Sequence, residues 1–315
     1  MAAKPYNPMK QYGDHAYQFI KKLGSQKNDR LRFLLVHDAV RRNDYYSASS
    51  AFTTFPTMRL QKPFYSLEST SSKLKLLTKR NKPVHVLKHN RNGYAVFMEI
   101  NDRETKTRSF KTARAQFIDV DLNKISYKFP TKRQLHQSIN NILTDPTEQI
   151  SSFSISRDNK GQYRMLAQRS RRRVAALKQS FLARHEDDIN DTMIVETKNG
   201  YHIYWVLKDG SLSNFVPIQK ALAQKFNSDP MITNLSRAMR IPGFYHMKNP
   251  ESPFMVKVKQ WGRDEPFTQE ELVQSLALNP VYATKKGNKV SKRRKVSKLR
   301  ALRRRGRMSR AKVGR

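Results

Sequence analysis

Residues 193–207 read Met-Ile-Val-Glu-Thr-Lys-Asn-Gly-Tyr-His-Ile-Tyr-Trp-Val-Leu. Two runs rich in β-branched and aromatic residues flank Lys198-Asn199-Gly200, and an Asn-Gly turn between such runs predicts a β-hairpin. A second hairpin is predicted where residues 84–87 and 94–100 flank Asn92-Gly93. Apolar periodicity predicts helices over residues 14–23, 31–40, 163–185, 214–226 and 268–278. Hairpins mixed with helices favour an α+β fold over a doubly wound parallel sheet.

The composition points to a polyanionic partner. The chain has 315 residues, with 62 Lys and Arg against 25 Asp and Glu, so its formal net charge is +37. Such an excess favours nucleic acid as the partner. The absence of cysteine excludes disulfides, thiolate zinc sites, Cys-ligated iron–sulfur clusters and a Cys nucleophile. No apolar run approaches the roughly 20 residues of a membrane helix, so we expect a cytoplasmic protein, associated with the nucleoid if the host is bacterial.

The chain is expected to divide into three parts. Residues 1–78 form an N-terminal unit without an interpretable motif, and residues 79–284 form the main domain, with an insert at about 125–190. Residues 285–315 form a basic tail with 16 Lys and Arg and no acid, which predicts disorder in the absence of a partner.

Two basic clusters are candidates for binding nucleic acid. One lies in the insert, where a basic amphipathic helix is expected, and the other lies in the tail. The candidates are Arg169, Arg171, Arg172 and Arg173 in the insert, and Lys292, Arg293, Arg294, Lys295, Arg303, Arg304 and Arg305 in the tail. A solvated surface helix explains the first cluster equally well. A non-specific arm, duplex docking or a nuclear-import signal could each explain the second.

Asp119 and Asp121 form the first motif with chemical potential. Residues i and i+2 of a strand point to the same side, so both carboxylates project together and repel each other. A divalent cation relieves that repulsion, and oxygen ligands suit Mg²⁺ or Mn²⁺. Taken alone, a D-x-D is more often a solvated strand end.

Two further motifs come later in the chain. His202 stands two residues after Gly200 of the turn at Lys198-Asn199-Gly200, which could leave room for a phosphate beside backbone N–H groups. Asp229 precedes Arg237, Arg240 and Lys248, and the two arginines would share a face on a helical turn. Three cations around one turn suit a triphosphate. Taken singly, a structural histidine and ordinary surface charge remain the simpler explanations.

The order of the three motifs resembles the archaeo-eukaryotic primase superfamily, most closely its RepB-like plasmid and phage DNA-primase branch. That family has a D-x-D on a strand, a hairpin ending in a His before an aromatic pair, and an acid followed by R-x-x-R-[LIV]-P-G-[FT] with a lysine beyond. Residues 200–205 here read Gly-Tyr-His-Ile-Tyr-Trp, and residues 237–244 read Arg-Ala-Met-Arg-Ile-Pro-Gly-Phe. Residues 92–97 are similar to the family's entry hairpin, and the resemblance covers residues 83–261.

The resemblance implies an RRM-like antiparallel sheet that carries a template-directed nucleotidyltransferase. Asp119, Asp121 and Asp229 would hold two Mg²⁺ or Mn²⁺ ions, with His202 on the triphosphate. Arg237, Arg240 and Lys248 would neutralise the triphosphate, helped by Lys198 and Asn199. The implied partners are a single-stranded DNA template, nucleoside triphosphates, and a replicative helicase or initiator protein.

The chain departs from the family pattern in two places. About 70 residues separate the first motif from the second, and Asn234 stands where the family often carries an acid.

The expected function is therefore primer synthesis on single-stranded DNA for a mobile element. A non-catalytic replication initiator and a carboxylate-dependent nuclease remain alternatives. A rolling-circle nuclease is disfavoured because no two histidines flank a single apolar residue.

Overall fold

The computed structural model describes residues 13–25, 30–38, 64–66, 76–77, 83–84, 86–101, 109–249 and 251–282. The predicted basic tail lies outside these residues, as does much of the predicted N-terminal unit. Contacts between residues divide the chain into residues 1–281 and 282–315, and every described helix and strand lies in the first unit. It combines antiparallel sheets with helices, so the predicted α+β class is confirmed.

The central sheet has the strand order β15-β10-β11-β6, and all its pairings are antiparallel. Its strands are β15 (Lys257–Gln260), β10 (Met193–Glu196), β11 (Gly200–Gly210) and β6 (Ala113–Asp121). The hairpin predicted over residues 193–207 is β10 and β11, closed by a 3.0 Å hydrogen bond from the Thr197 N–H to the Gly200 carbonyl.

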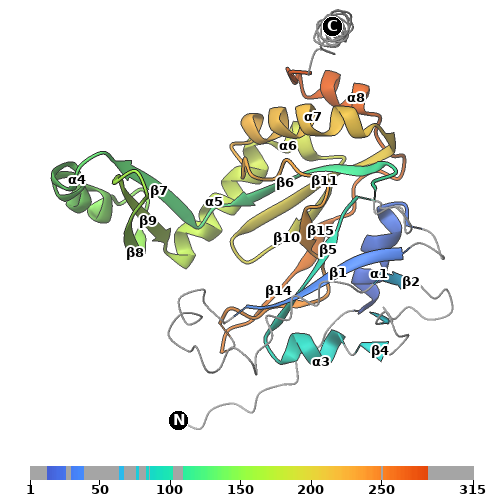
Figure 1. Ribbon diagram of the computed structural model, residues 1–315, viewed down its shortest axis with the longest axis horizontal. Helices are drawn as coiled ribbons and strands as arrows, with labels where there is room; N and C mark the ends of the chain where they lie inside the picture. Colours follow the sequence, from blue (N-terminus) through green and yellow to red (C-terminus); the bar gives the residue numbers. More distant parts are fainter. Residues whose placement is uncertain are drawn as a thin grey trace, which may run out of the picture. The chain divides into compact units, whose positions relative to one another are not determined.

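Helices pack against the central sheet (Figure 1). They are α5 (Arg171–Arg184), α6 (Glu186–Ile189), α7 (Leu212–Lys225) and α8 (Gln269–Ser275). Phe181 of α5 stacks on Tyr201 with ring centroids 6.3 Å apart, and the ring of Phe226, at the end of α7, lies 5.5 Å from that of Trp205. The helices predicted over residues 214–226 and 268–278 are confirmed as α7 and α8.

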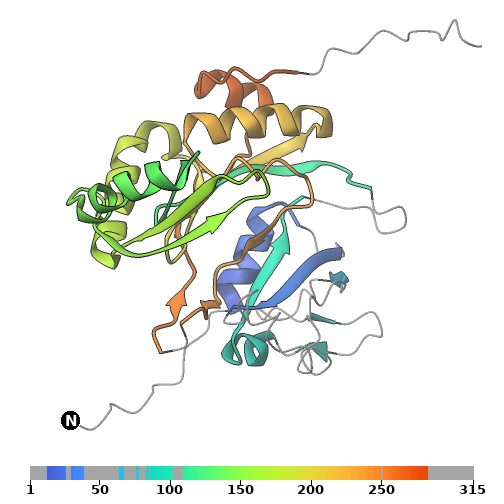
Figure 2. The same cartoon turned by 60° about the vertical axis from the view of Figure 1, so that its left-hand side comes forward.

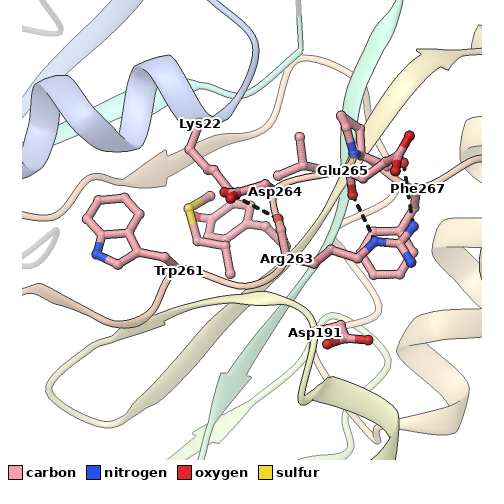
Figure 3. A pocket seen from close by; sticks show the side chains of 11 residues that line it. Lys22, Asp191, Trp261, Arg263, Asp264, Glu265 and Phe267 are labelled. Carbon is pink, nitrogen blue, oxygen red and sulfur yellow. Dashed lines mark hydrogen bonds and ion pairs between the residues drawn. The ribbon is translucent and has the colours of Figure 1, made fainter.

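The predicted N-terminal helix is α1 (Gly13–Lys22), and it joins the same core. The ring of Phe19 meets that of Tyr204 edge-on at 5.4 Å. Figure 3 shows Lys22 beside the chain after β15, where its Nζ donates to the Arg263 carbonyl at 2.7 Å and to Asp264 Oδ1 at 3.0 Å. The described N-terminal residues therefore belong to the same compact unit as residues 79–281.

A second sheet has the order β12-β5-β1-β2. Its strands are β12 (Ala238–Arg240), β5 (Tyr94–Glu99), β1 (Arg30–His37) and β2 (Phe64–Ser66). The helix predicted over residues 31–40 is wrong, because this segment is β1 and its buried Phe33 and Leu35 have the two-residue period of a strand. Pairing with β5 overrides the local apolar pattern.

The hairpin predicted from residues 84–87 and 94–100 is also wrong, because β5 pairs with β1 and β12 rather than with residues 84–87. Those residues contribute to β4 (Pro83–Val84), which pairs with β3 (Leu76–Leu77), and to α3 (Val86–Arg91). Gly93 has φ of +93° and its N–H bonds the Asn90 carbonyl at 3.1 Å, so the Asn-Gly pair ends a helix. A further short pair joins β13 (Tyr245–His246) to β14 (Phe254–Met255).

The insert is the group of green and yellow-green strands and the green helix in Figure 2, and it has a small core of its own. It consists of β7 (Lys124–Phe129), α4 (Lys132–Thr144), β8 (Ile150–Arg157) and β9 (Tyr163–Arg169), with the sheet order β7-β9-β8. Leu135 of α4 packs on Phe129, Met165 and Ala167. The helix predicted over residues 163–185 is correct only for its second half, because Ser170 caps α5 by accepting a hydrogen bond from the Arg173 N–H. The insert is therefore a sheet covered by a helix.

Among the described residues, no helix is both long and apolar enough to span a bilayer.

Gly200 permits the close approach of β11 to β6. A β-carbon at this position would lie 1.7 Å from the Val120 carbonyl oxygen, far inside any possible contact. Glycine is therefore required by space, at the end of the turn that precedes His202.

We predict that Gly200→Ala lowers the free energy of unfolding by about 1–3 kcal/mol or more, because the added methyl group must push β6 and β11 apart. Chemical denaturation of the purified variant measures this. Lys208→Ala, at an exposed position on the same strand, is the matched control and should be nearly neutral. Equal stability of both variants would contradict the close approach.

Candidate active site

The pairing of β6 with β11 brings the first two motifs together. His202 lies directly opposite Asp119, and Gly200 lies opposite Asp121. The His202 Nε2 is 3.7 Å from the Asp119 Oδ1. Because cross-strand partners share a side of the sheet, both carboxylates and the imidazole face the same way.

Asp229 joins them at the edge of the sheet. β6 is an edge strand, and its outer backbone is covered by groups from α7 and the loop after it. Gln219 bonds the Phe117 backbone there, and the Asp229 N–H donates to the Asp119 carbonyl at 3.2 Å. The chain thus places Asp229 beside the D-x-D even though about a hundred residues separate them.

Three carboxylates influence one another at this point. Burial and then the Asp121 carboxylate raise the pKa of Asp119 to about 6, and Asp229 adds to the rise while Arg237 and Arg240 oppose it. The side chain of Asp119 is nevertheless 31% exposed, so it can be reached from solvent. Negative charge gathered on an accessible surface favours a bound cation.

His202 is almost fully buried, with 7% of its side chain exposed. Burial, and then the charges of Arg240 and Arg237, lower its pKa to about 3. The imidazole is therefore neutral near pH 7, so its contact with Asp119 is not an ion pair. Its Nδ1 lies 3.3 Å from the Tyr204 hydroxyl, which orients the ring.

The donor set fits a divalent cation only in part. Asp119 and Asp121 offer carboxylate oxygens on one side of a strand, which hard cations prefer. Asp229 is instead paired with Arg237, whose Nη2 is 3.3 Å from Asp229 Oδ2. Across the residues that the structure describes, no group of three or more His, Asp or Glu side chains is placed to hold a metal ion. Two carboxylates are in place, and the third is engaged elsewhere.

Arg237 and Arg240 differ from the sequence expectation. They do not lie on a helical turn, because residues 238–240 form β12, which pairs with β5. Both side chains still act on Asp119 and His202 electrostatically. Their own partners are different, since Arg237 faces Asp229 and Arg240 does not.

Asp38 holds Arg240, and it is a residue that no sequence motif singles out. Both terminal nitrogens of the Arg240 guanidinium donate to the Asp38 carboxylate, Nη1 to Oδ2 at 3.0 Å and Nη2 to Oδ1 at 2.5 Å. The same carboxylate accepts the Met247 N–H at 2.8 Å. Only 7% of the Asp38 side chain is exposed, so this is a buried, bidentate pair. Asp38 therefore links the N-terminal part of the chain to the third motif.

Asn90 makes a second link of this kind. Its amide donates to the Tyr245 carbonyl and accepts the Tyr245 N–H, both at 2.8 Å. Residues 240–247 are thus held from two sides by residues that precede the D-x-D.

A basic groove lies next to the end of the β10–β11 hairpin. Its walls come from the base of the insert, the start of α5, the hairpin turn, and residues 246–259. Four predicted cations line it: Arg169 and Arg171, predicted to bind nucleic acid, and Lys198 and Lys248, predicted to bind the triphosphate. Lys178 of α5 lines it as well. Asn199 also lines it, and its carbonyl accepts the Leu122 N–H at 2.9 Å, so the groove reaches the residue after Asp121.

The other predicted cations lie elsewhere. Arg172 is exposed on α5 and Arg173 is partly buried, and neither lines the groove. Arg169, which does line the groove, is already paired: its Nε is 2.5 Å from Glu148 Oε2, and its Nη1 donates to the Leu122 carbonyl at 2.8 Å. The tail candidates, residues 292–295 and 303–305, fall outside the described residues.

Lys178 anchors α5 beside this groove. Its Nζ is 2.6 Å from Glu196 Oε1 and 3.0 Å from the Thr197 carbonyl. Burial raises the pKa of Glu196, but Lys178 and Lys257 outweigh it and leave that pKa below its ordinary value. Because the depressed pKa is a property of the folded state, ionised Glu196 stabilises the fold at neutral pH.

We predict that Glu196→Gln lowers the free energy of unfolding at pH 7 by about 3 kcal/mol, because it leaves the Lys178 charge buried without a counter-charge. The deficit relative to wild type should shrink as the pH falls below 4.5, the ordinary pKa of the group, since wild type then loses the same charge. Denaturant titrations across this range measure it. Glu251→Gln, at an exposed site, serves as the control, and a deficit that is independent of pH would contradict the assignment.

We also predict that replacing Arg240 lowers the free energy of unfolding much more than replacing Arg237. Arg240→Ala leaves Asp38 buried without its guanidinium partner and should cost about 3–5 kcal/mol. Arg237→Ala breaks a partly exposed pair and should cost no more than about 1 kcal/mol. Chemical denaturation compares them, and equal costs would show that Arg240 is not a structural anchor.

The chain matches a known protein family over about half of its length. The family model described as the RepB DNA-primase N-terminal domain matches residues 129–289. The match contains His202, Asp229, Arg237 and Arg240 and begins just after the D-x-D. No curated protein sequence matches the chain.

Three solved structures are distantly similar. The AEP domain of the cyanophage S-2L primase-polymerase has 12% identity and a TM-score of 0.42, with 85% of this chain and all of that domain covered. The primase RepB′ has 11% identity and a TM-score of 0.39, with 94% and 68% covered. The catalytic domain of the primase RepB′ in complex with initiator DNA has 11% identity and a TM-score of 0.40, with 84% and 93% covered.

Proposed function

The chain belongs to the RepB DNA-primase N-terminal domain family, and from this premise we propose that it synthesises primers on single-stranded DNA for a plasmid or phage. The observation that carries the proposal is the cross-strand register of β6 and β11, which sets His202 against Asp119 and places Asp121 one step further along the same side. Asp229 and Arg237 complete the arrangement at the sheet edge.

The reaction we propose is nucleotidyl transfer. A 3′-hydroxyl attacks the α-phosphorus of a nucleoside triphosphate and loses its proton to solvent. A new P–O bond forms, the bond from the α-phosphorus to the oxygen that bridges to the β-phosphorus breaks, and pyrophosphate leaves. Divalent cations, when bound, would neutralise charge and activate the hydroxyl. Asp119 and Asp121 would hold them, and Mg²⁺ sites of this kind commonly use one or two carboxylates together with water and substrate phosphates. Asp229 would be the third protein ligand.

Positive groups would bind the triphosphate. The side chain of Arg237 is 35% exposed, so it could leave Asp229 and pair with a phosphate instead. The Asp229 carboxylate would then be available to a cation. Lys198 and Lys248 line the groove beside it, where burial and then the charge of Arg171 lower the pKa of Lys198. This crowding of cations favours an anionic ligand. His202 would donate one N–H to a phosphate oxygen without adding charge.

Arg240 has a different part in this proposal. Both ends of its guanidinium already bind Asp38, so it would act on the triphosphate through its charge and by supporting the residues around it.

The test is primer synthesis by the purified full chain on single-stranded DNA, with labelled nucleotides and Mg²⁺ or Mn²⁺. Wild type should yield short oligomers. Asp119→Ala with Asp121→Ala should reduce the yield at least about a hundredfold, on the scale of losing groups that stabilise transition-state charge. Glu186→Ala with Asp187→Ala removes two exposed acids of α6 and should leave synthesis unchanged.

The same experiment separates the alternatives. Template binding without any product from wild type would indicate a non-catalytic initiator and overturn the proposal. Template degradation in the absence of nucleotides, abolished by the same double substitution, would indicate a nuclease built on the same carboxylates.

A further inference from the structure

α4 covers part of one face of the insert sheet, where Phe153 and Ile155 of β8 stay exposed, and the opposite face is open. α4 packs over the face that carries Phe129, Met165 and Ala167. The opposite face, which we call the open face, consists of alternate residues of β7, β9 and β8. In the register of the sheet one row across it is Lys128, Arg164 and Ser156, and another is Lys124, Gln168 and Ser152. Serines 126 and 154 flank Leu166 in the row between.

This face is basic and uncompensated. Lys128 lies directly opposite Arg164, and like charges paired across strands destabilise a sheet. No position of the open face is acidic, and no described carboxylate lies within ion-pair distance of Lys124, Lys128 or Arg164. All three cations are exposed. An anion bound across the face would convert this repulsion into attraction.

The chemistry of the open face selects the nucleic-acid backbone rather than the bases. Base stacking needs aromatic side chains, and the face has none. Its other residues are hydroxyls, an amide and one leucine, which suit phosphate and sugar contacts that carry no sequence information. Arg164 Nε donates to Ser126 Oγ at 2.9 Å, which fixes the guanidinium across the strands. Lys124 and Lys128 are four residues apart on β7, about 13 Å, so they would reach separate phosphates.

The open face continues into the basic groove and from there to the candidate active site. Gln168 belongs to both surfaces. Asn123, which also lines the groove, donates its N–H to Asp121 Oδ1 at 2.9 Å and accepts the Arg169 N–H at 2.9 Å. Lys124 is therefore the next residue after one that touches the D-x-D. A nucleic-acid strand lying along this surface would lead directly to the carboxylates.

We propose that the open face of β7, β9 and β8 is a nucleic-acid backbone site that guides the template strand into the groove beside Asp119 and Asp121. The identity of the strand as template rests on the proposed function, but the binding surface does not. Lys124, Lys128 and Arg164 each contact a phosphate of the strand, and the serines contribute hydrogen bonds.

The test compares two triple variants of the full chain. K124Q/K128Q/R164Q removes the cations of the open face, and K132Q/R133Q/K220Q removes three exposed cations on α4 and α7 that lie off it. Binding of a labelled single-stranded oligonucleotide is followed by fluorescence anisotropy over a range of salt concentrations. The first variant should lower the slope of log affinity against log salt by about 2, from three contacts at about 0.7 each. Thermal unfolding should show both variants folded.

Equal affinities and equal slopes for the two variants would overturn this inference. The proposed function would then still stand if wild type makes primers. If wild type makes none, yet the first variant alone loses affinity and slope, the binding surface is supported and the proposed function is overturned. Primer synthesis at limiting template should fall in the first variant and recover as template is raised, because the reacting carboxylates are unchanged.

Discussion

The antiparallel pairing of β6 with β11 is the constraint on which the candidate site depends. A shift of the pairing register by one residue would turn His202 away from Asp119. It would also place Asp119 and Asp121 on the face of the sheet that the helices cover. Gly200 maintains the register, because only a residue without a side chain fits against the Val120 carbonyl. The same pairing makes β6 an edge strand, and this open edge is what brings Asp229 alongside. One strand pair thus positions an imidazole and three carboxylates.

A second constraint reaches across the whole compact unit. The Asp38–Arg240 pair joins residues 202 positions apart in the chain, and the Met247 N–H adds to it. Burial makes this pair costly to break and leaves little freedom for the segment between β12 and β13. Arg237 is held more loosely at the surface. Two arginines of one motif therefore have separate tasks, one in holding the segment and one in facing the carboxylates.

Local sequence patterns predicted correctly those helices and hairpins whose structure is set by neighbouring residues. The hairpin at residues 193–207, the helices α1, α7 and α8, and the α+β class could be read from turn residues and periodicity. The motifs also contained His202, Asp119 and Asp229, which the structure brings close together, while the roles assigned to them stay predictions. The errors arose where distant strands decide the structure: β1 looks helical until β5 pairs with it, and Asp38 carries no signal without Arg240 beside it. The insert was misjudged because Ser170 divides one periodic stretch into a strand and a helix.

The insert leaves and rejoins the central fold at almost the same point. The Arg169 N–H bonds the Asn123 carbonyl at 2.9 Å, so the two ends of the excursion over residues 124–168 lie a hydrogen bond apart. Its small core shares no residue with the large one. An element joined in this way is a module: a short turn could close the gap it leaves, and another module could take its place without disturbing the sheet. Changes within residues 124–168 can therefore alter the surface of the insert while the register of β6 and β11, which positions the candidate site, stays the same.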